Sequence, residues 1–499
     1  MCKDKQKQAE NIMEEDESTA SVFKQFSTQF LHGMSVRMRE TYSRTQLDEF
    51  LKERFVFFQE ATRRSGMVRV KSHQLSTESQ QQESRYNGHV IVEISAPDAP
   101  FIVVTVEALM RKMELLIHRK LHPIMGVVLS AEKEIEAVIY PEEKMDKFDH
   151  LYLEIEADTD IVFLKRLETL IAGHMLAVQL VRNHRQKMLQ SLASMQTEIE
   201  SVTVVSADTK GEWSKLCGWL NLDNFTVMGF ISFLQSDSDS ADFIKTVENS
   251  GHGILAAEYI EKTSNILLNV LTAHLWKRRH SDFPFALDRV NFPSPVLRFE
   301  NLMVLSLRIP DAKLGMVEHV FLGLLRGSSL NVKNTETPLI HQKMRYIFEN
   351  RNMLKNSYDY NEVVRIFGAT PKFELFRSSR KELIQICDDL LSVNNPNNIH
   401  CFQIDTRNSE ILKLMVVMPT SLLNEEAIEQ MADFLKAKIP HQNCEWFEAR
   451  GSEKSRLHFE FELQEDLQGK SDLPSFDLLL LEGEISVLIK PWETQLREL

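Results

Sequence analysis

The sequence predicts an α+β fold, and the clearest evidence is the segment from His89 to Glu156. Residues 89–94 alternate between apolar and polar side chains, which is typical of a half-buried strand. Residues 98–113 follow with apolar side chains at helical spacing and with Pro100 in the first turn, where its missing N–H is no loss. Further extended runs cover residues 117–122, 124–129, 135–140 and 151–156. A helix that packs on one face of an antiparallel sheet accounts for this order.

A second segment near the end of the chain repeats these element types. It opens with the polar turn Asn394-Asn-Pro-Asn-Asn398 and continues as strand, strand, helix, strand and strand. The expected elements are residues 401–404, 411–418, 425–438, 444–448 and 456–463. The similarity of the two ends indicates a divergent duplication, although the two segments share no repeat at the residue level.

We expect four regions along the chain. Residues 1–87 form a helical lead-in with a polar linker, because apolar side chains recur at helical spacing through residues 21–69, whereas residues 72–87 are rich in Gln and Ser. Residues 88–200 hold the first module and a long amphipathic helix. Residues 205–395 form a central α/β domain, with strands expected near 225–234, 296–309 and 319–325. Residues 396–499 hold the second module and a C-terminal tail.

The composition is that of a globular protein and argues against several classes of function. The net charge of −14 argues against binding to nucleic acid or to an anionic membrane surface, since both reward clustered Lys and Arg. No apolar run approaches the roughly 20 residues that span a membrane, and no N-terminal signal sequence is visible. The five cysteines are widely spaced without a CxxC pair, so neither a disulfide framework nor a zinc site is indicated. These features together favour a cytoplasmic protein.

Several blocks of the sequence carry a resemblance to a known enzyme family. Asp98-Ala-Pro-Phe-Ile102, Leu116-Ile-His118 and His150-Leu-Tyr-Leu-Glu-Ile155 look like the first ACT-type domain of the large NAD-specific glutamate dehydrogenases of bacteria. Blocks that agree in the same order include residues 212–220, 224–230, 371–376, 412–419, 456–459 and 491–497. The resemblance covers roughly residues 88–499 and implies ACT-like (ferredoxin-like) modules that flank a mixed α/β central domain.

The resemblance also implies what the chain lacks. Members of the family continue through a third ACT-type domain to a catalytic domain that oxidises glutamate to 2-oxoglutarate with NAD, and this chain stops before those parts. We therefore assign no catalytic, cofactor-binding or metal-binding residue, and NAD is implied only for the absent catalytic domain. The expected role is regulation and assembly, either in a homo-oligomer or with a separate catalytic polypeptide. A stand-alone amino-acid sensor and an inactive fragment remain as alternatives.

Asp98, Pro100 and Phe101 are the candidates for an effector site. They lie where the first strand meets the first helix, and the N–H groups at such a place can receive the carboxylate of an amino acid. ACT-type modules often bind amino acids at loops of this kind. A helix cap and a turn also explain Asp98 and Pro100 without any ligand. The chain departs from the family inside this helix, where Val104-Thr105 stands in place of the usual Asp-Ser pair.

Other motifs have simpler explanations. Gly251-His-Gly253-Ile-Leu-Ala256 matches a dinucleotide-binding pattern, but the preceding residues do not read as a strand, so loop glycines are the better interpretation. His118 and His122 are four residues apart in an extended stretch without a third ligand, which favours packing over metal binding. The basic clusters 277–279 and 377–381 are expected to form salt bridges or solvated surface.

Overall fold

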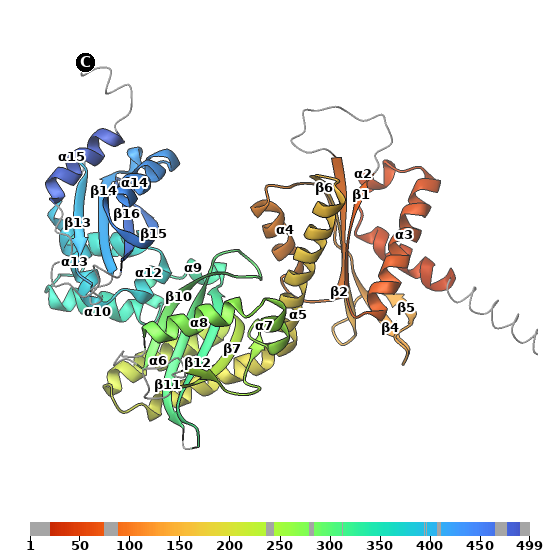
Figure 1. The fold of residues 1–499 in the computed structure, drawn as a ribbon, viewed down its shortest axis with the longest axis horizontal. Coiled ribbons are helices and arrows are strands. Elements are labelled where there is room, and N and C mark those ends of the chain that lie inside the picture. The colour runs from red at the N-terminus through yellow and green to blue at the C-terminus, as the bar shows by residue number, and fades with distance from the viewer. Residues whose placement is uncertain are drawn as a thin grey trace, which may run out of the picture. The chain divides into compact units, whose positions relative to one another are not determined.

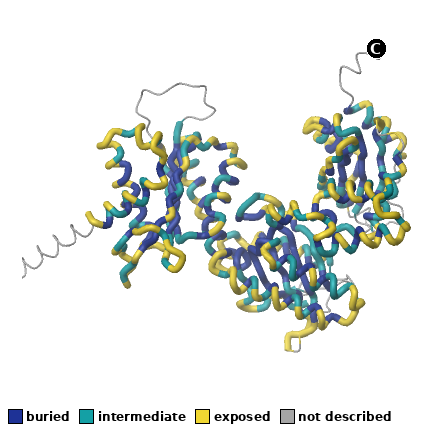
Figure 2. The backbone as a smooth tube through the Cα atoms, turned by 180° about the vertical axis from the view of Figure 1, so that it is seen from behind, coloured by how far each residue is buried: buried dark blue, intermediate teal, exposed yellow. Residues whose placement is uncertain are grey.

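The computed structural model describes residues 20–73, 88–235, 244–278, 284–311, 313–393, 395, 397–406, 411–464 and 477–489. The chain divides into two compact units, and Figure 1 labels the elements of both. Unit 1 comprises residues 1–192 and 227–324, and unit 2 comprises residues 193–226 and 325–499. Figure 2 shows that the inner strands of the sheets are buried, whereas the helices expose their outer faces.

The first sheet of unit 1 contains the strands that the sequence predicts. Its order is β1 (Met67–His73), β2 (Gly88–Pro97), β6 (Lys147–Ala157), β4 (Ile124–Leu129) and β5 (Ile135–Ile139), and β3 (Leu116–Leu121) also pairs with β6. Both β2 and β3 pair antiparallel to β6, so β2 and β3 run parallel with β6 between them. Helix α4 (Ile102–Lys112) connects β2 to β3, which makes a split βαβ unit.

Helices cover both faces of this sheet, in contrast to the single covered face that the sequence suggested. Figure 1 shows α3 (Arg44–Arg63) on one side and α4 and α5 (Ile161–Glu198) on the other. A helix over residues 20–32 and the short α2 (Val36–Glu40) precede α3. The expectation of a half-buried strand at residues 89–94 is therefore wrong, because residues 90–96 of β2 are buried without alternation.

The helical lead-in is part of this first module. The spacing predicts helix as far as residue 69, whereas α3 ends at Arg63 and residues 67–73 form β1, which pairs antiparallel with β2. Phe26, Phe30, Phe55 and Phe58 pack from the lead-in helices against the sheet. Sheet residues in the same core include Ile91, Met125, Val127, Phe148 and Tyr152. The strand at 67–73 escaped prediction because its pairing partner is separated from it by a polar segment, 74–87, that lies outside the described residues.

A second sheet completes unit 1. Its order is β10 (Phe285–Pro293), β11 (Asn301–Asp311), β12 (Gly315–Leu325), β7 (Phe225–Gln235) and β8 (Ile244–Thr246), and β9 (His252–Gly253) also pairs with β7. Helices α7 (Ala257–Lys262) and α8 (Ile266–Lys277) follow β9. The strand predicted at 296–309 begins later than expected, because residues 294–300 form a loop that the bond from the Ser294 N–H to the Glu300 carbonyl closes at 2.8 Å.

Unit 2 begins with helices and ends with a four-stranded sheet. The helices are α6 (Ala207–Trp219), α9 (Gly327–Leu330), α10 (Ile340–Asn350), α11 (Tyr358–Ala369), α12 (Lys372–Arg377) and α13 (Arg380–Ser392). The sheet order is β13 (His400–Ile404), β14 (Ile411–Pro419), β16 (Lys454–Leu463) and β15 (His441–Arg450). Helix α14 (Glu425–Lys438) lies between β14 and β15 in sequence, so the predicted strand, strand, helix, strand, strand order is confirmed.

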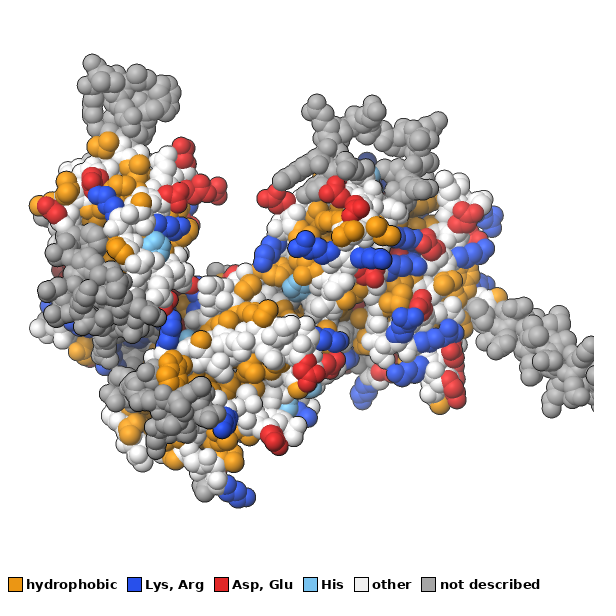
Figure 3. Space-filling model, in the orientation of Figure 1, with side chains coloured by type: hydrophobic (Ala, Val, Ile, Leu, Met, Phe, Trp, Pro, Cys, Tyr) orange, Lys and Arg blue, Asp and Glu red, His pale blue; other side chains and the backbone are white. Residues whose placement is uncertain are grey.

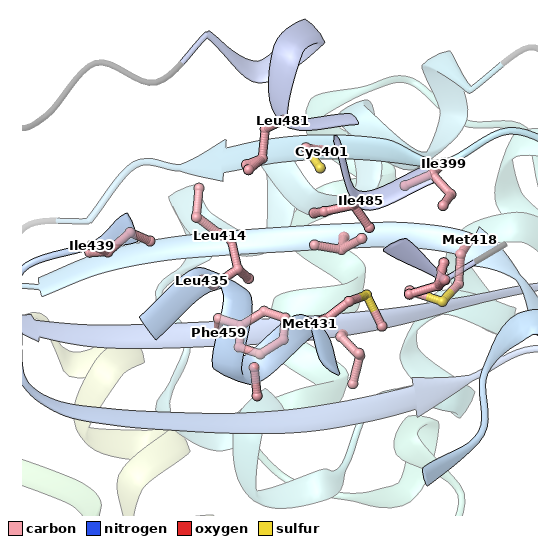
Figure 4. Packing of buried hydrophobic residues seen from close by; sticks show 14 of the residues in the cluster. Ile399, Cys401, Leu414, Met418, Met431, Leu435, Ile439, Phe459, Leu481 and Ile485 are labelled. Carbon is pink, nitrogen blue, oxygen red and sulfur yellow. The ribbon is translucent and has the colours of Figure 1, made fainter. Parts of the chain in front are cut away.

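The two faces of this last sheet differ in chemistry. Leu414, Phe459 and their neighbours on one face pack against α14 and α15 (Leu478–Leu488), and Figure 4 shows Met431, Leu435 and Ile485 of those helices in the same core. Arg456, His458 and Glu460 alternate with these apolar residues along β16 and so point to the opposite face. The residues of that polar face contact α11, α12 and α13.

Two findings concern the chain as a whole. Within the described ranges, no helix is both long enough and apolar enough to cross a membrane. The division of the chain into four regions, which the sequence predicts, stays a prediction.

Candidate functional site

The three residues predicted to form an effector site lie together between β2 and α4. The Asp98 N–H donates to the Lys147 carbonyl on β6 at 2.8 Å, which extends the strand pairing beyond Pro97. Pro100 is exposed in the following turn, and Phe101 is the N-cap of α4 in a left-handed conformation with φ 83°. The expectation that Asp98 caps the helix and that Pro100 lies in its first turn is wrong, because α4 begins only at Ile102 and its cap residue makes no side-chain hydrogen bond.

Charges of both signs surround the Asp98 carboxyl. Burial raises the pKa of the Asp98 carboxyl, and the nearby Asp149 carboxylate raises it further. Lys147, Arg182 and His122 lower the same pKa and offset part of this effect. A second carboxylate brought to Asp98 would meet the same repulsion. The effector role of Asp98, Pro100 and Phe101 stays a prediction.

Val104 and Thr105, which stand where the family usually has an Asp-Ser pair, have separate environments. Val104 is exposed, whereas Thr105 is fully buried. The Thr105 Oγ1 accepts a hydrogen bond from the Leu297 N–H at 2.9 Å, so the loop after β10 is joined to α4 at this point. Thr105 is thus a structural contact inside unit 1.

A cavity of about 310 Å³ in unit 2 is a stronger candidate for a functional site. Helices α11 and α13 line one side of it, and β14, β16 and the turn between β15 and β16 line the other. Its lining residues are Tyr358, Glu362, Arg365, Ile366, Ala369, Leu390, Val417, Gly451, Ser452, Glu453, Lys454, Ser455 and Arg456. The volume is at the lower end of the range of small-molecule sites.

Local sequence fixes the elements around this cavity. Helix α11 begins after Ser357, whose side chain accepts from the Tyr360 N–H. It ends at Ala369, with Thr370 as its C-cap just before a proline that cannot continue it. The β15–β16 turn requires Gly451, because a Cβ there would overlap the Lys454 carbonyl oxygen. Thr420 secures the same turn, since its hydroxyl donates to the Gly451 carbonyl at 3.0 Å and its N–H donates to the Glu453 carbonyl at 2.9 Å.

Arg456 forms part of the inner wall of the cavity and is only 6% exposed. Its Nη2 donates to the Ile366 carbonyl at 2.7 Å and to the Thr370 Oγ1 at 2.5 Å. Its Nε is buried without an acceptor among the described residues. Burial lowers the pKa of Arg456 to about 10, although Cys387 raises it slightly, so the guanidinium remains charged at neutral pH.

The carboxylates on the same face of the sheet are paired with other cations. Glu460 pairs with Arg377 and lies 3.5 Å from the Lys413 ammonium, which is 2.9 Å from Glu382. His458 separates this group from Arg456 along β16. Burial and the charges of the surrounding cations, Arg456 first, lower the pKa of His458 well below its usual value. Arg456 therefore forms no ion pair with a carboxylate in the part of the chain that the structure describes.

The glycine motif at 251–256 does not fit a dinucleotide. A Cβ on Gly251 would overlap the Leu255 carbonyl, and a Cβ on Gly253 would overlap the Met228 carbonyl, so both glycines are packed against backbone. The Gly253 N–H is not free to bind a phosphate, since it donates to the His184 Nδ1 at 3.0 Å. The helix that follows, α7, has only six residues. The loop therefore offers no fitting site for NAD.

His118 and His122 bond to separate carboxylates. The His118 Nε2 lies 3.2 Å from Glu156, and the His122 Nε2 lies 3.1 Å from the buried Asp149. Among the residues described, no three His, Cys, Asp or Glu side chains are placed to hold a metal ion.

Residues of both basic clusters form salt bridges, which is one of the two outcomes expected from the sequence. Arg278 lies 3.4 Å from the buried Glu318, and Arg377 pairs with Glu374 at 2.6 Å. Arg279 lies outside the described residues.

On the face of the molecule in Figure 3, Lys and Arg side chains are interspersed with Asp and Glu over the first module. These cations are paired within the chain and form no site of their own.

Sequence reasoning assigned no role to Arg456. The signal available was the alternation of Arg456, His458 and Glu460 with apolar residues in a strand, which indicates a face that is polar. Whether that face is buried and whether each charge has a partner depend on α11, α12 and α13, which are distant in sequence. The site therefore could not be identified before the structure.

Comparison with known proteins relates both units to one enzyme family. Residues 26–171 match the family described as "Glutamate dehydrogenase, ACT1 domain", and residues 337–395 match "Glutamate dehydrogenase, helical motif 1". The chain is 22% identical over 413 residues to the NAD-specific glutamate dehydrogenase of Pseudomonas aeruginosa, which covers 81% of this chain. It is 18% identical over 422 residues to the enzyme of the same name from Halomonas elongata, which covers 82% of this chain. The matched part is 25% of each relative, so the chain spans about a quarter of their length.

These matches agree with the architecture. The ACT1 match begins at residue 26, within the lead-in helices that pack on the first sheet. The match to helical motif 1 contains α10, α11, α12 and α13, and thus supplies the helical side of the cavity.

Proposed function

We propose that this chain, which resembles the N-terminal ACT-domain region of NAD-specific glutamate dehydrogenases, is a regulatory and assembly component of such an enzyme. The observation that carries the proposal is the alignment of about four fifths of the chain with enzymes of that name, including an ACT1 domain and a helical motif in one chain. No residue of this chain is assigned to hydride transfer, and the proposal leaves the NAD chemistry to a separate catalytic part. A cytoplasmic location and an oligomeric state are part of the same proposal.

The mechanism in this proposal is a change in the equilibrium between conformations. A ligand that binds one arrangement of the modules more tightly than another shifts the population toward it, and the catalytic part responds through its contacts with the modules. The size of the effect is limited by the difference in ligand affinity between the two arrangements.

Reconstitution tests this function directly. NADH formation from glutamate and NAD is followed by absorbance for three samples, which are the purified chain, a polypeptide that co-purifies with it, and the two combined. We expect activity that requires the second polypeptide and that changes when this chain is added. The matched control is this chain after heat unfolding, which should have no effect. Full activity of the second polypeptide with no response to the folded chain would contradict the proposal.

A stand-alone amino-acid sensor is a second candidate, and one observation favours it. The cavity at Arg456 is formed within unit 2, so ligand binding there would not require a catalytic polypeptide. Ligand binding by the chain, together with the absence of any co-purifying dehydrogenase, would support the sensor.

A further inference from the structure

The cavity in unit 2 combines a partly open hollow with a buried cation. Arg456 contributes the charge, and the Nη1 and Nε N–H groups of its guanidinium have no acceptor in the described part of the chain. A buried charged group is normally paired, because the loss of hydration is otherwise uncompensated. An arginine in this state is suited to bind an anionic group, since its fork of N–H donors matches the geometry of a carboxylate.

Lys343 in the same unit shows how a buried cation is satisfied when its role is structural. Its ammonium donates to the carbonyl oxygens of Leu375, Phe376 and Ser378 at 2.7–2.8 Å. These bonds use all the donors of an ammonium group. Arg456 also bonds to the end of a helix, α11, but it does so through Nη2 alone, and Arg456 is one of the residues that line the cavity.

The rest of the lining is consistent with a small ligand that has further polar groups. Lys454 and Arg365 add positive charge, although the ammonium of Lys454 donates to the Val393 carbonyl and Arg365 pairs with Glu362. Glu453 lies exposed in the turn at the edge of the cavity and has no ion pair within the described ranges. A ligand with one carboxylate and one ammonium group could place the first at Arg456 and the second near Glu453.

We infer that this cavity is a binding site for a small carboxylate, which accepts hydrogen bonds from the Arg456 guanidinium. The shared chemistry is the carboxylate, and an α-amino acid and a 2-oxo acid are its two sources. The inference rests on the proposed function only for the choice of these ligands. Binding itself is a property of the chain alone and does not require the catalytic polypeptide.

Titration calorimetry of the full chain with L-glutamate and, separately, with 2-oxoglutarate tests this inference. We expect at least one of them to bind, and Arg456→Gln to weaken that binding by roughly 30-fold or more, the range expected when a buried charge loses its partner. Arg351→Gln is the matched control, because Arg351 pairs with Asp388 in the same unit and does not line the cavity. The control should bind as the parent chain does.

A second variant keeps the test decisive if Arg456→Gln does not fold. Ala369→Trp retains the guanidinium but fills the cavity from α11, so it should also abolish binding. The inference is overturned if both ligands bind the parent chain more weakly than about 1 mM, or if Ala369→Trp binds as the parent does. Preference for L-glutamate that is lost in Glu453→Gln identifies an amino-acid site, and equal binding of 2-oxoglutarate identifies a site for the carboxylate alone.

The binding and reconstitution experiments can fail independently. Failure of both ligands to bind removes the site but leaves the assembly role intact. Ligand binding without any effect on a dehydrogenase retains the site and removes the proposed enzyme.

Discussion

Glu93 in the first sheet and Arg456 in the last sheet are both buried charges on interior strands, β2 and β16, and they differ in their partners. Glu93 accepts from the Arg54 Nε at 2.5 Å through one oxygen and from Arg69 Nε and Nη2 at 2.8 and 2.5 Å through the other. Burial alone would raise the pKa of Glu93, but the charges of Arg54 and Arg69 outweigh burial and lower it. Arg456 has hydrogen bonds only to neutral groups.

The difference separates a structural charge from a candidate binding charge. Both oxygens of Glu93 have arginine partners within the chain, and Arg54 also lies over the rings of Phe50 and Tyr152 at 4.5 and 5.0 Å. Removal of one partner from such a group leaves the other charge buried without compensation. Arg456 already lacks a carboxylate partner in the described part of the chain. A ligand carboxylate that pairs with Arg456 would therefore bind with a favourable free energy.

The largest effect is expected for Glu93→Gln. The change removes the buried carboxylate that accepts from Arg54, which is 2% exposed, and leaves it only the part-exposed Glu53 carboxylate at 3.1 Å among the described residues. We expect a loss of about 3–5 kcal/mol in the free energy of unfolding of the first module. Hydrogen exchange of the β2 and α3 amides measures this loss locally, which avoids the assumption that the whole chain unfolds in one step.

Glu134→Gln is the matched control for this prediction. Glu134 pairs with Arg63 at 2.7 Å, but both side chains are about half exposed. An exposed pair contributes at most about 1 kcal/mol, so exchange in β2 should not change measurably. Equal effects of the two variants would mean that the Glu93 group contributes no more than a surface pair does.

The next effect concerns pH and His150. This side chain is fully buried among Phe26, Phe30, Phe57 and Phe58, and neither ring nitrogen has a hydrogen-bond partner among the described residues. Burial lowers the pKa of His150 to about 4, while Glu93 raises it and Arg54, Arg69 and His122 lower it. In the unfolded chain the pKa is near its usual value of about 6.5.

Because the unfolded state binds the proton more tightly, the first module loses stability as pH falls from about 6.5 toward 4. The loss at the lower limit is about 3 kcal/mol, from a pKa difference of about two units or more. His150→Phe removes this term and keeps an aromatic ring in the core. The free energy of unfolding of the variant, minus that of the parent, should therefore increase as pH is lowered. Urea unfolding at pH 7.5 and pH 5 measures this difference. A difference that does not depend on pH would contradict the assigned role of His150.

The same comparison shows what the sequence could predict. Helix and strand periodicity identified β2, α4, β6 and the elements of the last sheet, because amphipathic spacing is a local property. It missed β1 and placed the start of α4 too early, because β1 depends on pairing with β2 and because Asp98 is bonded to β6 before the helix begins. Both errors arise from contacts between segments that are distant in sequence.

The candidate site was less predictable than the fold for a related reason. The sequence identifies Glu93 and Arg456 equally as charged residues in strands, and nothing local distinguishes them. Glu93 acquires its partners from α3 and β1, whereas the elements around Arg456 supply a carbonyl and a hydroxyl. Only the three-dimensional arrangement shows which charge has a partner.

The smallest effect on stability is expected for Arg456→Met. This variant tests the difference between Glu93 and Arg456 directly. The carbonyl of Ile366 also accepts from the N–H and hydroxyl of Thr370 at 3.1 and 2.7 Å, so the loss of the guanidinium leaves it bonded. Removal of an uncompensated buried charge offsets the two lost hydrogen bonds, and the free energy of unfolding of unit 2 should change by no more than about 1 kcal/mol. A loss as large as that of Glu93→Gln would show instead that Arg456 is a structural cap of α11. Ligand binding then distinguishes the parent from Arg456→Met. Ligand at 100 times Kd should raise the free energy of unfolding of the parent by about 2.7 kcal/mol and leave that of the variant unchanged.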